Sequence, residues 1–237
     1  PPRSTLFPYT TLFRSDLTGK QVLVVGGVSG IDKAIIQQVS ELGARVTCYD
    51  ENDMLKIESS FKEIVKNNGA FDGMVFCIVH SDFRPLQFVK PDYVNEILND
   101  NFNMFVEIMR SLNKAKGLKE GASVVAMSSI SSIRAMKAKM AFCAAKAALD
   151  ASIRCLAVEL ACKGIRVNSV QKGGVDVDFE KDHIQNINTL NEEFTSRKQF
   201  LGISKAGEIA NVVAFLLSDA TRTITGTSIV IDGGYIL

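Results

Sequence analysis

Apolar runs and amphipathic stretches alternate along most of this chain. Short runs rich in β-branched residues predict strands, and longer segments with helical spacing separate them. The predicted strands are 21–26, 45–49, 73–79, 123–127, 165–170 and 228–231, and the predicted helices are a segment ending at 42, then 54–66, 91–114, 136–162 and 206–218. Because the strands are apolar throughout, this alternation indicates a doubly wound parallel sheet with helices on both faces.

Length and composition fit one α/β domain with a large core. The chain has 237 residues, of which 46% are hydrophobic and 22% are charged, and a chain of this size favours one domain over two. We assign the domain to residues 16–237. Residues 1–15 resemble the in-frame translation of a DNA-sequencing adapter, so we exclude them from the fold. A genuine N-terminal arm is the alternative.

Charge and cysteine usage indicate a small-molecule partner in a reducing compartment. Lys and Arg number 27 against 26 Asp and Glu, without a basic block, so neither nucleic acid nor an anionic membrane is predicted. The five cysteines show no C-x-x-C spacing, and His80 and His183 lack the partner spacing of a metal site. No apolar run has the length of a membrane span. We expect a cytoplasmic protein that holds no metal.

Within the predicted helix 136–162, the part from residue 142 to residue 161 is apolar around nearly its whole circumference. A helix on the surface of a monomer carries a single apolar stripe. One face of this helix can pack on the sheet while another packs on a second subunit, so we expect a homodimer or homotetramer. Complete burial within a monomer is the alternative interpretation.

A serine, an aromatic residue and a lysine follow one another at a specific spacing. Ser129 precedes Phe142 by 13 residues, and Lys146 follows Phe142 by four, which places the last two on one helix face. Together with Asn101 in an earlier helix, this arrangement resembles the Ser…Tyr-x-x-x-Lys site of the short-chain dehydrogenase/reductase family, in particular 3-oxoacyl-acyl-carrier-protein reductases. The resemblance extends from about residue 16 to residue 237.

The resemblance assigns catalytic roles to these four residues. In the family, the tyrosine hydroxyl transfers the proton at the substrate oxygen, the lysine activates that hydroxyl and binds the cofactor ribose, and the serine holds the substrate oxygen. Asn101 matches the asparagine that helps to maintain a water-linked proton relay near Lys146. Phe142 carries no hydroxyl, so the resemblance implies a site that lacks its proton donor.

A glycine-rich turn follows the first predicted strand and opens a helix. Backbone N–H groups and the helix dipole at such a turn suit a dinucleotide pyrophosphate. The turn resembles the family's Gly-x-x-x-Gly-x-Gly, which implies cofactor contacts from Gly26, Ser29, Gly30 and Ile31. Asp32 stands where the third glycine belongs, and its carboxylate adds bulk and like-charge repulsion beside a pyrophosphate. A turn that binds no cofactor, with Asp32 stabilising the helix start, is the alternative.

Asp50 ends the second predicted strand, 20 residues beyond Gly30. An acidic residue at that distance can hydrogen-bond the adenosine ribose hydroxyls, which favours NAD(H) over NADP(H). Equally, the segment from Asp50 to Asp53 resembles the Asp-x-x-Asp that ends the family's third strand, so that Asp50 contacts adenine or Asp53 caps the next helix. The chain is short here, as though an edge strand were missing, either naturally or through an error in the sequence.

Two later turns also differ from the family pattern. The residues from Phe76 to Val79 replace Asn-Asn-Ala-Gly, and we expect Val79 to narrow the cofactor cleft, an apolar strand extension being the alternative. Gln171-Lys172-Gly173 replaces Ala-Pro-Gly. The resemblance implies that Gly173 still contacts the cofactor.

The resemblance implies an NAD(P)-dependent oxidoreductase that acts on a carbonyl or alcohol substrate. Phe142, Asp32 and Val79 favour the alternative of a non-catalytic relative that serves in assembly or ligand binding. Errors in the sequence would produce the same departures. The polar segment 176–199, which would shape the substrate pocket, carries no signal that identifies the substrate.

Overall fold

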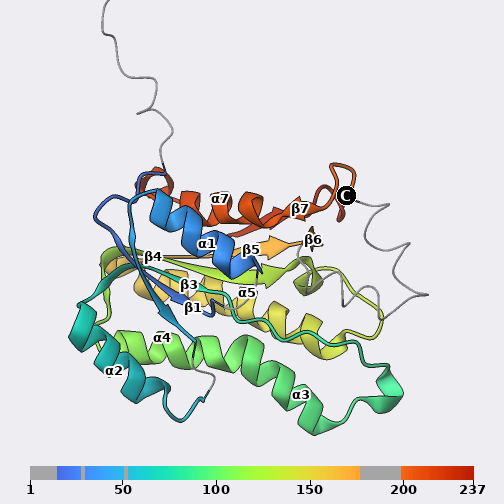
Figure 1. The fold of residues 1–237 in the computed structure, drawn as a ribbon. Helices are drawn as coiled ribbons and strands as arrows, with labels where there is room; N and C mark the ends of the chain where they lie inside the picture. The colour runs from blue at the N-terminus through green and yellow to red at the C-terminus, as the bar shows by residue number, and fades with distance from the viewer. Residues whose placement is uncertain (1–14, 28–29, 51–52, 177–198) are drawn as a thin grey trace, which may run out of the picture.

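A six-stranded parallel sheet forms the middle layer of the computed structural model, which describes residues 15–27, 30–50, 53–176 and 199–237 (Figure 1). Its strand order is β2-β1-β3-β4-β5-β8. The strands are β1 (Gln21–Val25), β2 (Arg45–Tyr49), β3 (Phe71–Phe76), β4 (Leu118–Ser129), β5 (Arg166–Lys172) and β8 (Ser228–Ile231). The two-residue strands β6 (Val175–Asp176) and β7 (Ser204–Lys205) pair separately. The predicted doubly wound parallel sheet is confirmed.

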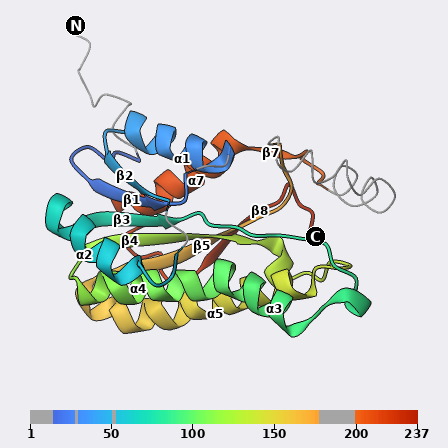
Figure 2. The same cartoon turned by 60° about the horizontal axis from the view of Figure 1, so that its bottom comes forward.

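Helices cover both faces of this sheet (Figures 1 and 2). On one face, α1 (Gly30–Glu41) and α7 (Ala206–Leu217) pack on strand residues such as Val24 and Val125. On the other, α2 (Ile57–Asn68), α4 (Met104–Lys114) and α5 (Met140–Leu160) enclose a second core that contains Phe61, Phe105 and Leu149. The two apolar layers explain why the strands are apolar throughout.

Strand β2 forms one edge of the sheet and pairs only with β1. No further strand follows it at that edge in the described ranges, as expected from the short segment after Asp50. Asp53 caps a turn rather than α2 itself: its Oδ1 accepts a hydrogen bond from the Leu55 N–H at 3.0 Å, whereas α2 begins at Ile57.

Several predicted elements have different bounds in the structure, and two of these differences affect the site. The expected helix 91–114 is divided into α3 (Pro91–Leu98) and α4 by a π-helical segment, Asn99–Asn103. The third strand ends at Phe76, so the expected extension to Val79 is wrong. Beyond the end of the strand, the Asn101 side chain holds the backbone of His80, accepting from its N–H at 3.2 Å and donating to its carbonyl at 2.7 Å.

None of the helices in the described residues combines the length and the apolar character that crossing a membrane requires.

Candidate active site

Three elements bring the predicted catalytic residues to the carboxyl end of the sheet. Ser129 is the last residue of β4, Phe142 and Lys146 lie one turn apart on α5, and Asn101 lies in the π-helical segment. The Lys146 Nζ lies 5.8 Å from the centroid of the Phe142 ring. It also donates a hydrogen bond at 3.0 Å to the carbonyl of Met127, two residues before Ser129. Lys146 therefore connects the aromatic ring to the strand that carries the serine.

Burial changes the protonation of Lys146. Its side chain is fully buried, and desolvation, followed by the nearby ammonium group of Lys172, lowers the pKa of Lys146 to about 7. The carboxylate of Asp150 and the thiol of Cys77 act in the opposite direction. Lys172 is paired with Ser129 in the β4–β5 register, so both lie at the same level of the sheet. Near neutral pH, the charge of Lys146 therefore depends on its charged neighbours.

We expect the free energy of unfolding to rise with pH above about 7 because of Lys146. Its pKa is about 7 in the folded chain, against an ordinary value of 10.5. Between these values the unfolded chain binds the extra proton, so raising the pH favours folding, whereas below about 7 the burial cost is present in full. Urea unfolding on either side of pH 7 should show the rise, and Lys146→Met should remove most of it. An equal rise in the variant would contradict the assignment.

Asn101 is fully buried, and its side chain is hydrogen-bonded to the loop residue His80 and to α3. Its Nδ2 donates to the carbonyl of Ile97 at 2.9 Å, in addition to its two bonds with the backbone of His80. π-Helical segments of this kind often lie at functional sites, because they turn a side chain out of the regular helical register. In this chain, the π-helical segment directs the Asn101 amide toward the end of β3.

Ser129 and Phe142 have different surroundings. The Ser129 Oγ accepts a hydrogen bond from the Ser131 N–H at 3.1 Å. The Phe142 ring is 5% exposed and lies in a small buried cluster with Tyr93 and Ile97. The ring therefore occupies a defined position, but it offers no proton.

Two residues beside Phe142, Lys139 and Tyr93, are not predicted from the sequence to belong to the site. Lys139 donates to Ser81 Oγ at 3.0 Å, and its Nζ lies 5.3 Å from the centroid of the Phe142 ring. The spacing of Lys139, Phe142 and Lys146, three and then four residues, could have revealed this shared face. Tyr93 belongs to the same cluster as Phe142, and only the packing of α3 on α5 brings it there. Desolvation and the charge of Asp82 raise the pKa of Tyr93, which makes its hydroxyl a weaker acid.

The glycine turn holds a carboxylate of its own. Asp32 lies in the first turn of α1, is 6% exposed, and its Oδ2 accepts a hydrogen bond from the Gly27 N–H at 3.0 Å. Gly26 has φ of +108°, and a Cβ there would lie 3.1 Å from the Cβ of Cys77 and 3.3 Å from the Asp32 Oδ2. Burial and then Asp32 raise the pKa of the Cys77 thiol. A backbone donor suited to a phosphate, the Gly27 N–H, is therefore bound to Asp32 and is not available to a dinucleotide while that hydrogen bond persists.

The other predicted cofactor contacts are divided between the surface and the core. Asp50 is exposed at the end of β2, and Gly30 is exposed at the start of α1, whereas the Ile31 side chain lies in the core. Gly173 lies against β8, where a Cβ would come within 2.9 Å of the Asp232 Cα. Close packing therefore explains Gly173 without a ligand. Ser29 and most of the segment 176–199 lie outside the described residues.

The narrowing of the cofactor cleft by Val79 stays a prediction. Its side chain is 37% exposed. Val79 directly precedes His80, and the Nδ1 of His80 lies 2.7 Å from the Asp100 Oδ2.

The strand order and the glycine turn between β1 and α1 define the class of protein as a Rossmann-type α/β fold. A family model described as "Enoyl-(Acyl carrier protein) reductase" matches residues 18–236. The chain belongs to this branch of the short-chain dehydrogenase/reductase family.

Individual relatives agree with this assignment. The NADH-dependent enoyl-acyl-carrier-protein reductase FabI of Buchnera aphidicola (subsp. Acyrthosiphon pisum) is 30% identical over 253 residues, covering 92% of this chain and 95% of the relative. L-Xylulose reductase of Caenorhabditis elegans is 28% identical and covers 93% and 97%. A short-chain dehydrogenase family protein from Francisella tularensis has a solved structure that is 26% identical, with a TM-score of 0.79 over 92% of this chain and 98% of its own. These similarities support the nicotinamide class of cofactor.

Proposed function

We propose that this chain retains the framework of an NAD(P)-dependent oxidoreductase for a carbonyl or alcohol substrate, and that its turnover is low. The observation that carries the proposal is the position of Lys146, buried beside the Phe142 ring and bonded to the strand that ends in Ser129. Asn101 completes the set of four residues. Because residue 142 is a phenylalanine, the site lacks its proton donor. The framework remains, because the Phe142 ring is packed in a buried cluster.

A cofactor titration tests whether the framework binds its ligand. We expect weak NADH binding and weaker NADPH binding, because Asp50 can hydrogen-bond ribose hydroxyls but repels a 2′-phosphate. Calorimetry with each dinucleotide measures both affinities. Asp50→Asn should reduce the difference between them. Equal affinities in the unmodified chain would remove Asp50 from the ribose site.

The second candidate function is a non-catalytic protein that uses the fold for assembly or ligand binding. The hydrogen bond from the Gly27 N–H to Asp32 favours it, because the turn is stabilised without a phosphate. Absence of dinucleotide binding by both the unmodified chain and Asp32→Gly would favour this function.

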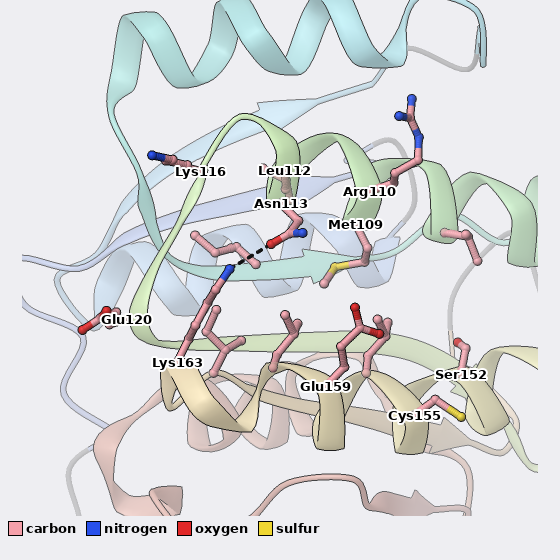
Figure 3. A pocket seen from close by; sticks show the side chains of 15 residues that line it. Met109, Arg110, Leu112, Asn113, Lys116, Glu120, Ser152, Cys155, Glu159 and Lys163 are labelled. Atoms are coloured by element: carbon pink, nitrogen blue, oxygen red, sulfur yellow. Dashed lines mark hydrogen bonds between the residues drawn. The ribbon is translucent and has the colours of Figure 1, made fainter.

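We also propose that the chain forms a homodimer or homotetramer through a groove between α4 and α5 (Figure 3). The groove has a volume of about 580 Å³, and its lining includes the apolar side chains of Val106, Met109, Leu156 and Leu160. Its lining also contains both charge signs, with Lys116 and Lys163 alongside Glu120 and Glu159. A surface with both signs can pair with its own copy across a two-fold axis, so a second copy of this chain is the occupant.

Light scattering at micromolar concentration should give the mass of a dimer or tetramer. Cys155 is exposed and lines the groove, so Cys155→Arg should lower the measured mass by introducing a charge into the interface. Ser40→Arg, on an exposed position of α1, is the matched control and should leave the mass unchanged. A monomer in the unmodified protein would contradict the proposal.

A further inference from the structure

Asp150 is a buried carboxylate one helical turn beyond Lys146 on α5. It is 4% exposed and accepts three hydrogen bonds, from Ser128 Oγ at 3.0 Å, Ser169 Oγ at 2.8 Å and Gln171 Nε2 at 2.8 Å. Two serine hydroxyls and an amide N–H all donate to it, which is the pattern of an ionised carboxylate. Burying a charge is unfavourable unless it is compensated, so three hydrogen bonds and a nearby cation are expected around it.

The hydrogen-bond partners of Asp150 lie around the carboxyl end of β4. Lys146 bonds the carbonyl of Met127, and Asp150 bonds the hydroxyl of Ser128, so α5 holds the two consecutive residues that precede Ser129. Gln171 also donates to Ser132 Oγ at 2.9 Å, in the turn that follows Ser129. The network therefore contacts residues on both sides of Ser129.

Asp150 is also the carboxylate that acts on the charge of Lys146. Lys146 is faced by Asp150 from α5, Lys172 from β5 and Cys77 from the end of β3. The carboxylate favours the ammonium form of Lys146, whereas Lys172 and burial oppose it. An (i, i+4) pair on a helix is close enough for such an interaction, and burial reduces its screening by water.

We propose that Asp150 is a positioning residue of the candidate active site, which supplies the counter-charge of Lys146 and holds Ser129 between α5 and β5. Gln171, which stands in place of the family's alanine, extends this network to the turn after Ser129. The proposal rests on the proposed function only for the role of Lys146. The coupling of the two charges requires neither a cofactor nor turnover.

The test is a pH titration of Lys146 in the full chain, followed by NMR of 15N-labelled lysine side chains and assigned with Lys146→Arg. Asp150→Asn keeps the shape of the side chain and removes its charge. We expect this variant to lower the titration midpoint of Lys146 by about one pH unit or more. Ser169→Ala removes one hydrogen bond to Asp150 without changing the charge, and Glu159→Gln removes an exposed carboxylate of α5. Both controls should leave the midpoint within about 0.3 units.

An unchanged midpoint in Asp150→Asn, or an equal shift in Ser169→Ala, would overturn the proposal. If Asp150→Asn does not fold, the double variant Lys146→Met/Asp150→Asn decides between the two roles. Loss of both charges should restore folding if the carboxylate serves as a counter-charge. A double variant that also fails to fold would show a purely structural role and would equally overturn the proposal. Because neither measurement uses a dinucleotide, a failed cofactor titration leaves this result unaffected.

Discussion

Phe142→Tyr should raise carbonyl reductase activity by about 10²–10⁴-fold over the unmodified chain, which is the usual contribution of a general acid. The Phe142 ring packs in a buried cluster, and the Lys146 Nζ lies 5.8 Å from its centroid. Under the proposed function, Ser129 and Asn101 supply the other two members of the site. A hydroxyl added to this ring is therefore the missing chemical group. NADH oxidation, followed with ketones and with short acyl and enoyl thioesters, measures the gain.

The control is a hydroxyl on a neighbouring ring. The Phe83 ring lies 4.1 Å from the Nζ of Lys139, the other lysine that faces the Phe142 ring. Phe83→Tyr therefore adds a hydroxyl near Lys139 without restoring one at position 142, and it should give no gain. Turnover by the unmodified chain at ordinary enzyme rates would contradict the central inference about Phe142. In that event another group supplies the proton, and Tyr93→Phe tests the hydroxyl in the same buried cluster.

Asp32→Gly should tighten NADH binding by about tenfold or more, because it removes a negative charge from the phosphate position. The structure adds a second reason. The Asp32 carboxylate holds the Gly27 N–H at 3.0 Å, and its removal makes that donor available to a phosphate. Calorimetry measures the change, and NADH should gain more than NADPH if Asp50 binds the ribose. Asp32→Gly is also expected to increase the rescue by Phe142→Tyr, since the reaction requires bound NADH.

Asp32→Asn separates the effect of the side chain's charge on NADH binding from the effect of its shape. The amide keeps the size of the carboxylate, so an intermediate gain in NADH affinity is expected. Asp53→Asn is the matched control, because it changes another acidic residue of the same half of the chain, which caps a turn before α2. Equal NADH affinities before and after Asp32→Gly would show that Asp32 does not oppose the cofactor.

The fold could be predicted from the sequence because its signals are local. Apolar runs at β1 and β8 and the helical spacing of α7 are properties of short segments, and alternation along the chain is enough to indicate a parallel sheet. Boundaries depend on distant contacts. The segment after β3 is an example: its His80 backbone is hydrogen-bonded to the Asn101 side chain, 21 residues away, and a local pattern cannot contain such a contact.

The sequence by itself determined the spacing of Ser129, Phe142 and Lys146 and the absence of a hydroxyl between them, since residue type and helical periodicity suffice for both. Only the tertiary structure decided the electrostatics of the site. Burial and the neighbouring Lys172 lower the pKa of Lys146, and Asp150 opposes this shift. The fold of the glycine turn brings the Gly27 N–H, a donor suited to a phosphate, to the Asp32 carboxylate. Desolvation and long-range packing arise from segments that are far apart in the chain, so no local pattern contains them.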